Sequence, residues 1–196
     1  MMNPIDVIKQ TRNEARKVLD ANADVCFLAL ASPNGEASVR TLVLRDIIEN
    51  RFSLFINQSS PKWQLLSEGA SYQLLLWYPS QQRQFRISGR SEPIDSAAVR
   101  TNWQRRPSGS KYLDYVYNEF AAQSSALDSR EQLTSEIERL KSLHKPDDMT
   151  PPDQVTGVEL IANEIELLDL NSDDRIHDRL RFSLSAGVWS SKPLVP

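Results

Sequence analysis

The chain has 196 residues, of which 40% are hydrophobic, and 23 Lys and Arg against 26 Asp and Glu give a net charge of −3. This composition is typical of a globular protein, and the length suffices for one hydrophobic core. A single cysteine excludes disulfides within the chain and cysteine-based metal sites, and two histidines leave little for a histidine-rich one. No apolar stretch reaches the ~18 residues of a membrane span, and the N-terminus lacks the apolar run of a signal peptide. We therefore expect a cytoplasmic protein.

The charge is distributed unevenly along the chain. Residues 40–111 carry 11 Lys and Arg against 5 acids, a net +6, whereas residues 112–196 carry 8 against 16, a net −8. Arginine binds phosphate or carboxylate through two parallel hydrogen bonds, so the cationic middle is a candidate for anion binding. The alternative is that these side chains lie on solvated strand faces. Nucleic acid is a poor candidate partner, because the acidic C-terminal part would repel it.

The first half of the chain predicts a helix followed mostly by antiparallel strands. Residues 4–20 place apolar side chains at helical spacing. Strands with apolar or alternating patterns follow over 25–31, 37–48, 51–56, 72–78 and 83–94. A helix is expected over 59–69, because Ser59 or Ser60 can cap it, Pro61 suits its first turn and Gly69 can close it.

The second half predicts helices and then strands. Asp95 can cap a helix that ends near Arg105, and a loop over 106–110 follows. Further helices are expected over 111–121 and 129–144, a loop over 145–153, and strands near 155–161, 164–170 and 187–191. We expect one β-rich domain over 1–196, with an N-terminal helix in 1–24, helical insertions in 95–145 and C-terminal strands in 154–196. A small barrel is the most economical arrangement.

Standard catalytic motifs are absent, and several reactive residues have structural interpretations. Cys26 lies inside an apolar run, so we expect a core residue. His144 closes the apolar face of a predicted helix, which indicates a structural role. Four aromatic residues crowd one short helix and suit a subunit interface, although a core or lid role is an alternative. They are Tyr112, Tyr115, Tyr117 and Phe120.

Two cationic clusters are candidates for anion binding. On a strand, Arg40, Leu42 and Leu44 share one face, and Thr41, Val43 and Arg45 share the other. Such a strand can hold an anion with its arginines while its backbone meets a flat ring. The segment Ser59-Ser60-Pro61-Lys62 places hydroxyls, backbone N–H groups and a lysine at a helix N-terminus, which favours phosphate. An ordinary capped helix is the alternative.

A third cluster is Arg175-Ile-His-Asp-Arg179, which holds two arginines, a histidine and an aspartate in five residues. His177 is the histidine outside a predicted apolar face, and neighbouring charges can tune its protonation near neutral pH. The alternative is a charged loop without a chemical role.

Taken in order, these segments resemble the pyridoxamine 5′-phosphate oxidase family of FMN-binding split barrels. RTLVLR (40–45) resembles its Arg-x-Val-Leu-Leu-Lys strand, FSLFINQSSPK (52–62) its Phe-x-Phe-Tyr-Thr-Asn-x-x-Ser-Arg-Lys segment, and RQFRISGR (83–90) its Arg-Gln-Val-Arg-x-x-Gly stretch. Further matches are Arg106-Pro107-x-x-Ser110, Gln123-Ser124-Ser125, Arg175-Ile-His-Asp-Arg179 and the C-terminal VWSSKPLVP. The resemblance runs from about residue 25 to 196.

The resemblance implies a mainly β fold with inserted helices, an FMN-binding split β-barrel, and a homodimer with FMN at the subunit interface. The residues that it assigns to FMN are Arg40, Thr41, Leu42, Val43, Leu44, Arg45, Phe55, Ile56, Ser60, Lys62, Gln84, Gln123, Ser124 and Arg179. The residues that it assigns to a phosphorylated substrate are Arg45, Arg106, Ser110, Arg175 and His177, with Arg175 and His177 lining the reacting carbon. Gln123 and Ser124 are expected from the partner chain.

The resemblance also implies oxidation of pyridoxamine or pyridoxine 5′-phosphate to pyridoxal 5′-phosphate by O2, a step of vitamin B6 metabolism. The flavin carries the redox chemistry, so the part of the protein would be to orient the ligands and to provide charges complementary to theirs. The sequence departs from the family pattern at Arg45, Pro61, Asn102 and Leu168. An FMN enzyme with another small-molecule substrate is therefore one alternative, and a non-catalytic flavin-binding module is another.

Overall fold

The computed structural model describes residues 2–196, and these form two compact units. The unit that we call the sheet unit lies within Met1–Leu54, Gly69–Glu92 and Glu159–Pro196. The unit that we call the helical unit comprises Phe55–Glu68 and Pro93–Val158. The single domain expected over 1–196 stays a prediction.

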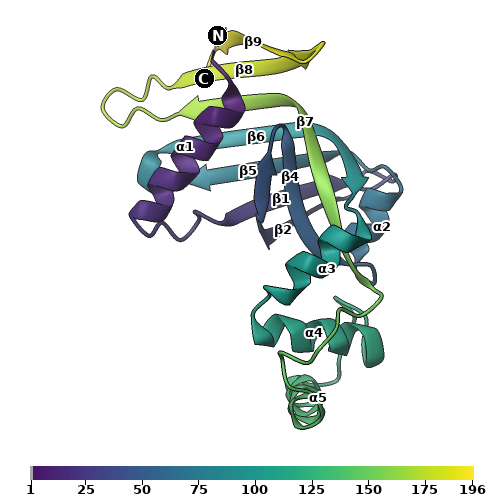
Figure 1. The fold of residues 1–196 in the computed structure, drawn as a ribbon. Helices are drawn as coiled ribbons and strands as arrows, with labels where there is room; N and C mark the ends of the chain where they lie inside the picture. The colour runs from purple at the N-terminus through teal and green to yellow at the C-terminus, as the bar shows by residue number, and fades with distance from the viewer. Residues whose placement is uncertain (1) are drawn as a thin grey trace. The chain divides into compact units, whose positions relative to one another are not determined.

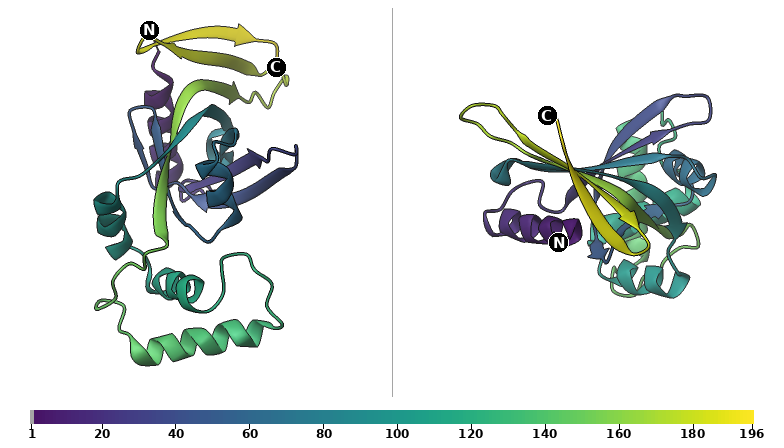
Figure 2. Two further views of the ribbon diagram at one scale, coloured as in Figure 1. Left: turned by 90° about the vertical axis from the view of Figure 1, so that its right-hand side faces the viewer. Right: turned by 90° about the horizontal axis from the view of Figure 1, so that it is seen from above.

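A nine-stranded sheet is the main feature of the fold (Figure 1). Its strands are β1 Val25–Ala31, β2 Ala37–Val43, β3 Asp46–Ile48, β4 Arg51–Asn57, β5 Tyr72–Tyr78, β6 Arg83–Pro93, β7 Val155–Asp169, β8 Asp178–Ser185 and β9 Val188–Leu194. The order is β2-β1-β5-β6-β7-β4-β3, and β8 joins β7 to β9. The pairs β1–β2, β1–β5, β5–β6 and β8–β9 are antiparallel, and Figure 2 shows the strands strongly twisted. The mainly β prediction is confirmed.

Alternation along the strands builds the core of the sheet unit. In β1, Cys26, Leu28 and Leu30 are buried, while Phe27 and Ala29 are half-buried on the opposite face. Cys26 is therefore a core residue, as predicted, and burial raises the pKa of its thiol to about 12.

An N-terminal helix and a short 3-10 helix complete the sheet unit. Helix α1 spans Pro4–Lys17 and contacts both η1, Pro79–Gln81, and β5. Ile5, Ile8 and Ala15 are its buried apolar side chains, so it covers the core with one face.

Strands β6 and β7 pack closely against each other at Gly89. A Cβ atom at this position would lie 1.9 Å from the carbonyl oxygen of Ile161 and 3.0 Å from the amide nitrogen of Asn163. Both are backbone atoms of β7, so they cannot move aside as a side chain can. The glycine is required by this close packing of strands.

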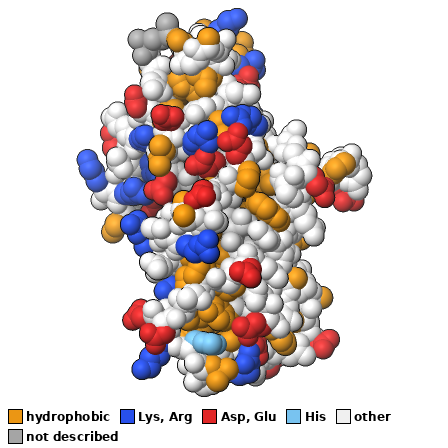
Figure 3. Space-filling view, turned by 45° about the vertical axis from the view of Figure 1, so that its right-hand side comes forward, with side chains coloured by type: hydrophobic (Ala, Val, Ile, Leu, Met, Phe, Trp, Pro, Cys, Tyr) orange, Lys and Arg blue, Asp and Glu red, His pale blue; other side chains and the backbone are white. Residues whose placement is uncertain are grey.

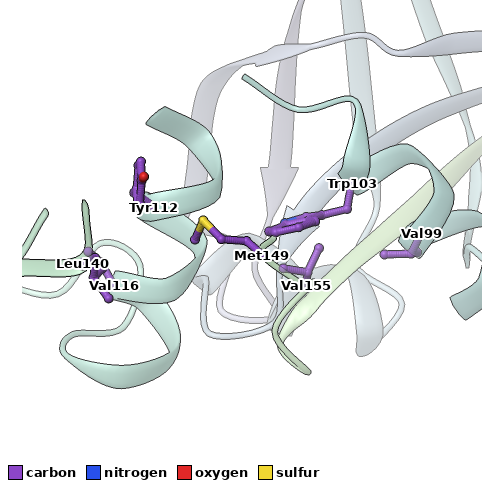
Figure 4. Close-up of a cluster of buried hydrophobic side chains, with 7 residues drawn as sticks. All are labelled: Val99, Trp103, Tyr112, Val116, Leu140, Met149 and Val155. Atoms are coloured by element: carbon purple, nitrogen blue, oxygen red, sulfur yellow. The ribbon is translucent and has the colours of Figure 1, made fainter. Parts of the chain in front are cut away.

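Four helices and a small apolar cluster form the helical unit: α2 Pro61–Ser67, α3 Ser96–Gln104, α4 Ser108–Glu119 and α5 Arg130–Leu143. The cluster consists of Val99, Trp103, Tyr112, Val116, Leu140, Met149 and Val155. Figure 4 shows Met149 extending from its loop between Tyr112 and Trp103. Methionine suits such a position because its flexible thioether fills irregular gaps.

The aromatic residues of α4 mostly serve this core. Tyr112 is buried, and Tyr115 and Tyr117 pack against the cluster, whereas Phe120 is 45% exposed. His144 lies beside Tyr115 with the two rings 5.2 Å apart, and its backbone carbonyl accepts a hydrogen bond from the Tyr112 hydroxyl. The structural interpretation of His144 is confirmed, and the core alternative holds for the tyrosines.

Several predicted boundaries were wrong for identifiable reasons. The strand expected over 37–48 is two strands, because the backbone N–H groups of Leu44 and Arg45 donate to Asp24 and Ser53 between them. The strands expected near 155–161 and 164–170 are one strand, β7, because Asn163 continues it with an exposed side chain. Strand β8 was missed, since its charged residues hide the alternation.

Helix boundaries moved less. Asp95 caps α3 as predicted, its carboxylate accepting from the N–H groups of Ala97 and Ala98. Helix α1 ends at Lys17, before the predicted 20, and Leu19 has a left-handed φ of 56°. Helix α4 begins inside the predicted loop, at Ser108. None of the helices in residues 2–196 has the length and apolar character needed to cross a membrane.

Candidate functional site

The predicted site residues are divided between the two units. Those in the sheet unit are Arg40, Thr41, Leu42, Val43, Leu44, Arg45, Gln84, Arg175, His177 and Arg179. Those in the helical unit are Phe55, Ile56, Ser60, Lys62, Arg106, Ser110, Gln123 and Ser124. Each set is described within its own unit.

A pocket of about 180 Å³ in the sheet unit brings together three of these residues, Gln84, His177 and Arg179. The remaining lining residues are Arg86, Glu166, Leu168 and Pro196. The cluster Arg175–Arg179 thus contributes His177 and Arg179 to this pocket. Arg175 is exposed on the preceding loop with a left-handed φ of 61°, and it is not among the lining residues.

Glu166 is the electrostatic centre of this pocket, and no sequence motif indicated it. Its carboxylate accepts a hydrogen bond from Arg86, one of 2.8 Å from Arg179 and one of 3.3 Å from Arg181. Burial raises the pKa of this carboxyl, but hydrogen bonds from Arg179 and Arg86 outweigh burial and lower the pKa to about 2. Glu166 lies opposite Arg181 in the β7–β8 register, which only a prediction of β8 would have revealed.

A backbone contact orients the histidine of the pocket. Nδ1 of His177 accepts a hydrogen bond of 3.1 Å from the amide N–H of Asn171. In the neutral ring the proton therefore resides on Nε2. The ring has a fixed donor atom in this tautomer.

A larger groove of about 540 Å³ adjoins the pocket and shares Gln84, Arg86 and Glu166 with it. Its apolar lining residues include Phe27, Ala29 and Leu75, which alternate with buried core residues along β1 and β5, and Val39 of β2. The groove therefore joins an apolar floor to a polar, charged end. Such a surface suits a flat ring system with polar edges.

Strand β2 has the face alternation predicted for the first cluster. Arg40 and Leu42 are half-buried, and Thr41 and Val43 are exposed. Leu44 and Arg45 follow the strand, the former buried and the latter half-buried.

Arg40 is a partly satisfied cation on this strand. Its Nη2 donates to the hydroxyl of Ser38, whereas its Nη1 is buried and has no hydrogen-bond partner within residues 2–196. Burial lowers the pKa of the guanidinium, the direction expected for a cation removed from water. A buried donor without a partner is costly, so Arg40 is suited to receive an anionic ligand.

In the helical unit, the segment Ser59–Lys62 is hydrogen-bonded to Gln123, another predicted site residue of the same chain. Nζ of Lys62 donates to Oε1 of Gln123 at 2.7 Å, and the Gln123 amide N–H donates to the Ser59 hydroxyl at 3.0 Å. Ser60 is fully buried, donates to the carbonyl of Asn57 and caps α2 by accepting from the Trp63 N–H. The ordinary capping role is therefore present at Ser60.

The remaining predicted site residues of the helical unit differ in burial and location. Ile56 is buried, while Phe55 is half-buried and packs against the apolar cluster. Ser124 is exposed with a left-handed φ of 75°, and Ser110 is in the first turn of α4.

Arg106 lies beside a buried acid that the sequence analysis missed. Its Nε is 3.2 Å from Oδ2 of Asp114, which also accepts a hydrogen bond of 2.7 Å from the Trp103 indole N–H. Burial raises the pKa of Asp114, and Arg106 and Trp103 reduce that shift without reversing it. The sequence does not indicate the burial of Asp114, because a single aspartate on a helix rich in aromatic residues has the pattern of a solvent-exposed residue.

The curled antiparallel sheet with helices inserted after β4 and β6 defines the class of FMN-binding split barrels. A structure described as PhzG from Burkholderia lata 383 in complex with tetrahydrophenazine-1-carboxylic acid matches with a TM-score of 0.88 and 24% identity, over 99% of this chain and 93% of that one. A pyridoxamine 5′-phosphate oxidase-related, FMN-binding protein from Nostoc punctiforme PCC 73102 matches with a TM-score of 0.79 and 19% identity, over the full length of both chains. These likenesses establish the fold.

Sequence comparisons establish the family. The family model described as pyridoxamine 5′-phosphate oxidase matches residues 12–144. A relative from Nostoc punctiforme named pyridoxine/pyridoxamine 5′-phosphate oxidase is 30% identical over 196 residues, which are 100% of this chain and 89% of the relative. One of the same name from Pelagibacter ubique is 26% identical over 197 residues, 100% of this chain and 92% of the relative. The chain belongs to the pyridoxamine 5′-phosphate oxidase family, which comprises FMN-dependent oxidoreductases.

Proposed function

We propose that this protein binds FMN and oxidises pyridoxamine or pyridoxine 5′-phosphate to pyridoxal 5′-phosphate with O2. The observation that carries the proposal is the buried Nη1 of Arg40, which has no hydrogen-bond partner within the described residues and lies on the strand that resembles the family's Arg-x-Val-Leu-Leu-Lys segment. The FMN phosphate is an anion able to accept a hydrogen bond from that donor. Gln84 and Arg179, which line one pocket of the sheet unit, offer an amide and a guanidinium suited to the polar edge of a flavin.

The assignment of further FMN contacts follows the family motifs, residue by residue. Lys62 and Ser60 belong to the phosphate-binding segment, and Gln123 is already hydrogen-bonded to Lys62. The backbone of residues 41–45 would run beside the ring, and Phe55, Ile56 and Ser124 complete the set. When bound, FMN supplies the two-electron redox chemistry.

The substrate contacts are proposed in the same way. Arg106 and Ser110 would bind the substrate phosphate, and Arg45, Arg175 and His177 would lie on the pyridine side. His177 with its proton on Nε2 would donate a hydrogen bond to the substrate. Overall, pyridoxamine 5′-phosphate, water and O2 would give pyridoxal 5′-phosphate, ammonium and hydrogen peroxide.

A second candidate is oxidation of a different small molecule by the same fold. It is favoured by Asp114, whose buried carboxylate offsets the charge of Arg106 and so weakens the attraction for a phosphate dianion. The solved structure of PhzG contains a ring carboxylate, tetrahydrophenazine-1-carboxylic acid, and that class of ligand needs less cationic charge than a phosphate ester.

We also propose a cytoplasmic homodimer, in keeping with a family whose proteins are commonly dimeric. Val39 and Val43 are 68% and 56% exposed on one face of β2, and an apolar face of this kind is suited to a subunit contact. Sedimentation of the FMN-loaded protein tests this directly, with a monomer at micromolar concentration as the contradicting result.

The activity is tested by supplying the FMN-loaded protein with pyridoxamine 5′-phosphate under air. We expect pyridoxal 5′-phosphate and hydrogen peroxide in equal amounts, and an increased KM for Arg106→Gln. The unphosphorylated amine is the matched control. Absence of turnover, with flavin bleaching by a ring carboxylate under anaerobic conditions, would favour the second candidate. Flavin that no donor reduces would favour a non-catalytic binding module.

A further inference from the structure

Helix α1 carries an arginine that reaches across to the end of β2. The Arg12 side chain is 6% exposed, which is rare for a cation. Its Nε donates to the carbonyl of Ala23 at 3.1 Å, and its Nη2 donates to the carbonyl of Leu44 at 2.6 Å. The same Nη2 lies 2.7 Å from Oδ1 of Asp24 and 3.5 Å from the carbonyl of Arg45.

These contacts fall where the predicted long strand divides into β2 and β3. Leu44 and Arg45 lie outside both strands, and their carbonyl groups point to Arg12. Their N–H groups are bonded separately, to the carbonyls of Asp24 and Ser53. A single guanidinium therefore fixes the carbonyl side of this two-residue connection.

Arg16 provides an internal comparison. It donates to the same Asp24 carboxylate from the next turn of α1, but its side chain is 44% exposed and, within residues 2–196, donates no hydrogen bond to Leu44 or Arg45. Burial raises the pKa of Asp24, yet the hydrogen bonds from Arg16 and Arg12 outweigh burial and lower it overall. The two arginines thus share an acid and differ in their reach to the strand.

We infer that Arg12 is a positioning residue for FMN binding, which acts by holding the backbone of Leu44 and Arg45 in place. The inference rests on the proposed function, in which the backbone of residues 41–45 runs beside the flavin ring. Ordering this connection before the ligand arrives reduces the conformational cost of binding. Arg12 itself makes no contact with FMN in this account, and its effect passes through the two carbonyl groups.

The experiment compares Arg12→Gln and Arg12→Lys with the matched control Arg16→Gln. FMN affinity is measured by quenching of flavin fluorescence, and the environment of the bound ring by visible circular dichroism. We expect Arg12→Gln to weaken FMN binding on the order of tenfold and to change the dichroism. Arg12→Lys, which keeps one charged donor, should weaken it less, and Arg16→Gln should stay within about twofold.

A second measurement does not depend on FMN. Amide hydrogen exchange of the FMN-free protein should be faster at Leu44 and Arg45 in Arg12→Gln and unchanged there in Arg16→Gln. Unchanged FMN affinity and unchanged exchange in Arg12→Gln would overturn the inference, as would equal losses of affinity in both variants. Failure of the natural protein to bind FMN would instead overturn the proposed function, and the two failures are therefore distinguishable.

Discussion

The two units of the chain place their charges differently. In the sheet unit, most of the paired arginines meet carboxylates near the surface, as in Arg83–Asp169 at 2.8 Å, and Arg12 is a buried exception. On the face drawn in Figure 3, Lys and Arg side chains lie beside Asp and Glu side chains over much of the surface. In the helical unit, Lys111 and Asp114 are 6% and 2% exposed within the fold.

The buried charges of the helical unit have specific partners. Nζ of Lys111 donates to the carbonyl of Pro146 at 3.0 Å and lies 5.1 Å from the centre of the Trp103 ring. Asp114 accepts from the same tryptophan and faces Arg106. Exposed ion pairs contribute little to stability, whereas removal of one member of a buried network leaves the other uncompensated. Apart from the buried Arg12, the sheet unit should therefore depend mainly on backbone packing, and the helical unit on its buried polar network.

The largest expected effect tests the packing of the sheet unit. Gly89→Ala places a Cβ atom 1.9 Å from a backbone oxygen of β7, so the strands must separate, and we expect a loss of more than ~4 kcal/mol in unfolding free energy. Denaturant unfolding measures it. Gly109→Ala is the control, because no atom lies within 4 Å of its Cβ position and helix α4 favours alanine over glycine by up to ~1 kcal/mol. Equal stability of the two variants would contradict the close approach.

The next effect tests the buried network of the helical unit. Asp114→Ala leaves Arg106 without its ion-pair partner and the Trp103 indole N–H without its acceptor, and should cost about 3 kcal/mol in chemical unfolding. The exposed Asp147→Ala should change stability by less than ~0.5 kcal/mol. A loss at Asp114 no larger than at Asp147 would show that the network contributes nothing.

A pH titration of stability examines the carboxylate at the centre of the sheet-unit pocket. The folded pKa of Glu166, about 2, lies below its ordinary value of 4.5, so the folded state favours the ionised form. Its contribution is complete above pH 4.5 and is lost as the pH falls toward 2. Glu166→Gln should flatten the decline of the thermal midpoint between these values. An identical decline of the thermal midpoint in both proteins would contradict the stabilising ion pairs assigned to Glu166.

The smallest effect concerns an exposed pair. Nζ of Lys141 lies 2.7 Å from Glu138 on α5, and both side chains are about half exposed or more. Lys141→Ala should change the unfolding free energy by at most ~0.5 kcal/mol, and added salt should reduce the difference further. A loss comparable to that of Asp114→Ala would break the distinction between exposed and buried charges.

Sequence patterns predicted best where neighbouring residues decide the local structure. Strands β1 and β5 have their predicted bounds because each is a short run of mostly apolar residues, and Asp95 caps α3 because its side chain accepts from nearby N–H groups. At the break between β2 and β3, the carbonyl of Leu44 accepts a hydrogen bond from Arg12, 32 residues earlier in the chain, and no local pattern encodes such a contact.

The candidate site shows the same limit. The motifs identified Gln84, His177 and Arg179, which line one pocket. Glu166 was missed because its importance arises from register between β7 and a strand that its own charged residues conceal. Asp114 was missed because its partners Trp103 and Arg106 come from α3 and the segment after it.

FMN titration of the purified protein tests whether this chain binds FMN with Arg40 as a ligand of the phosphate. We predict that the natural protein takes up FMN and quenches its fluorescence, and that Arg40→Ala weakens binding on the order of tenfold or more. Arg90 is exposed and paired with Glu92, so Arg90→Ala should leave the affinity for FMN unchanged. A natural protein that takes up no FMN, or an Arg40→Ala variant that binds it equally well, would contradict the account.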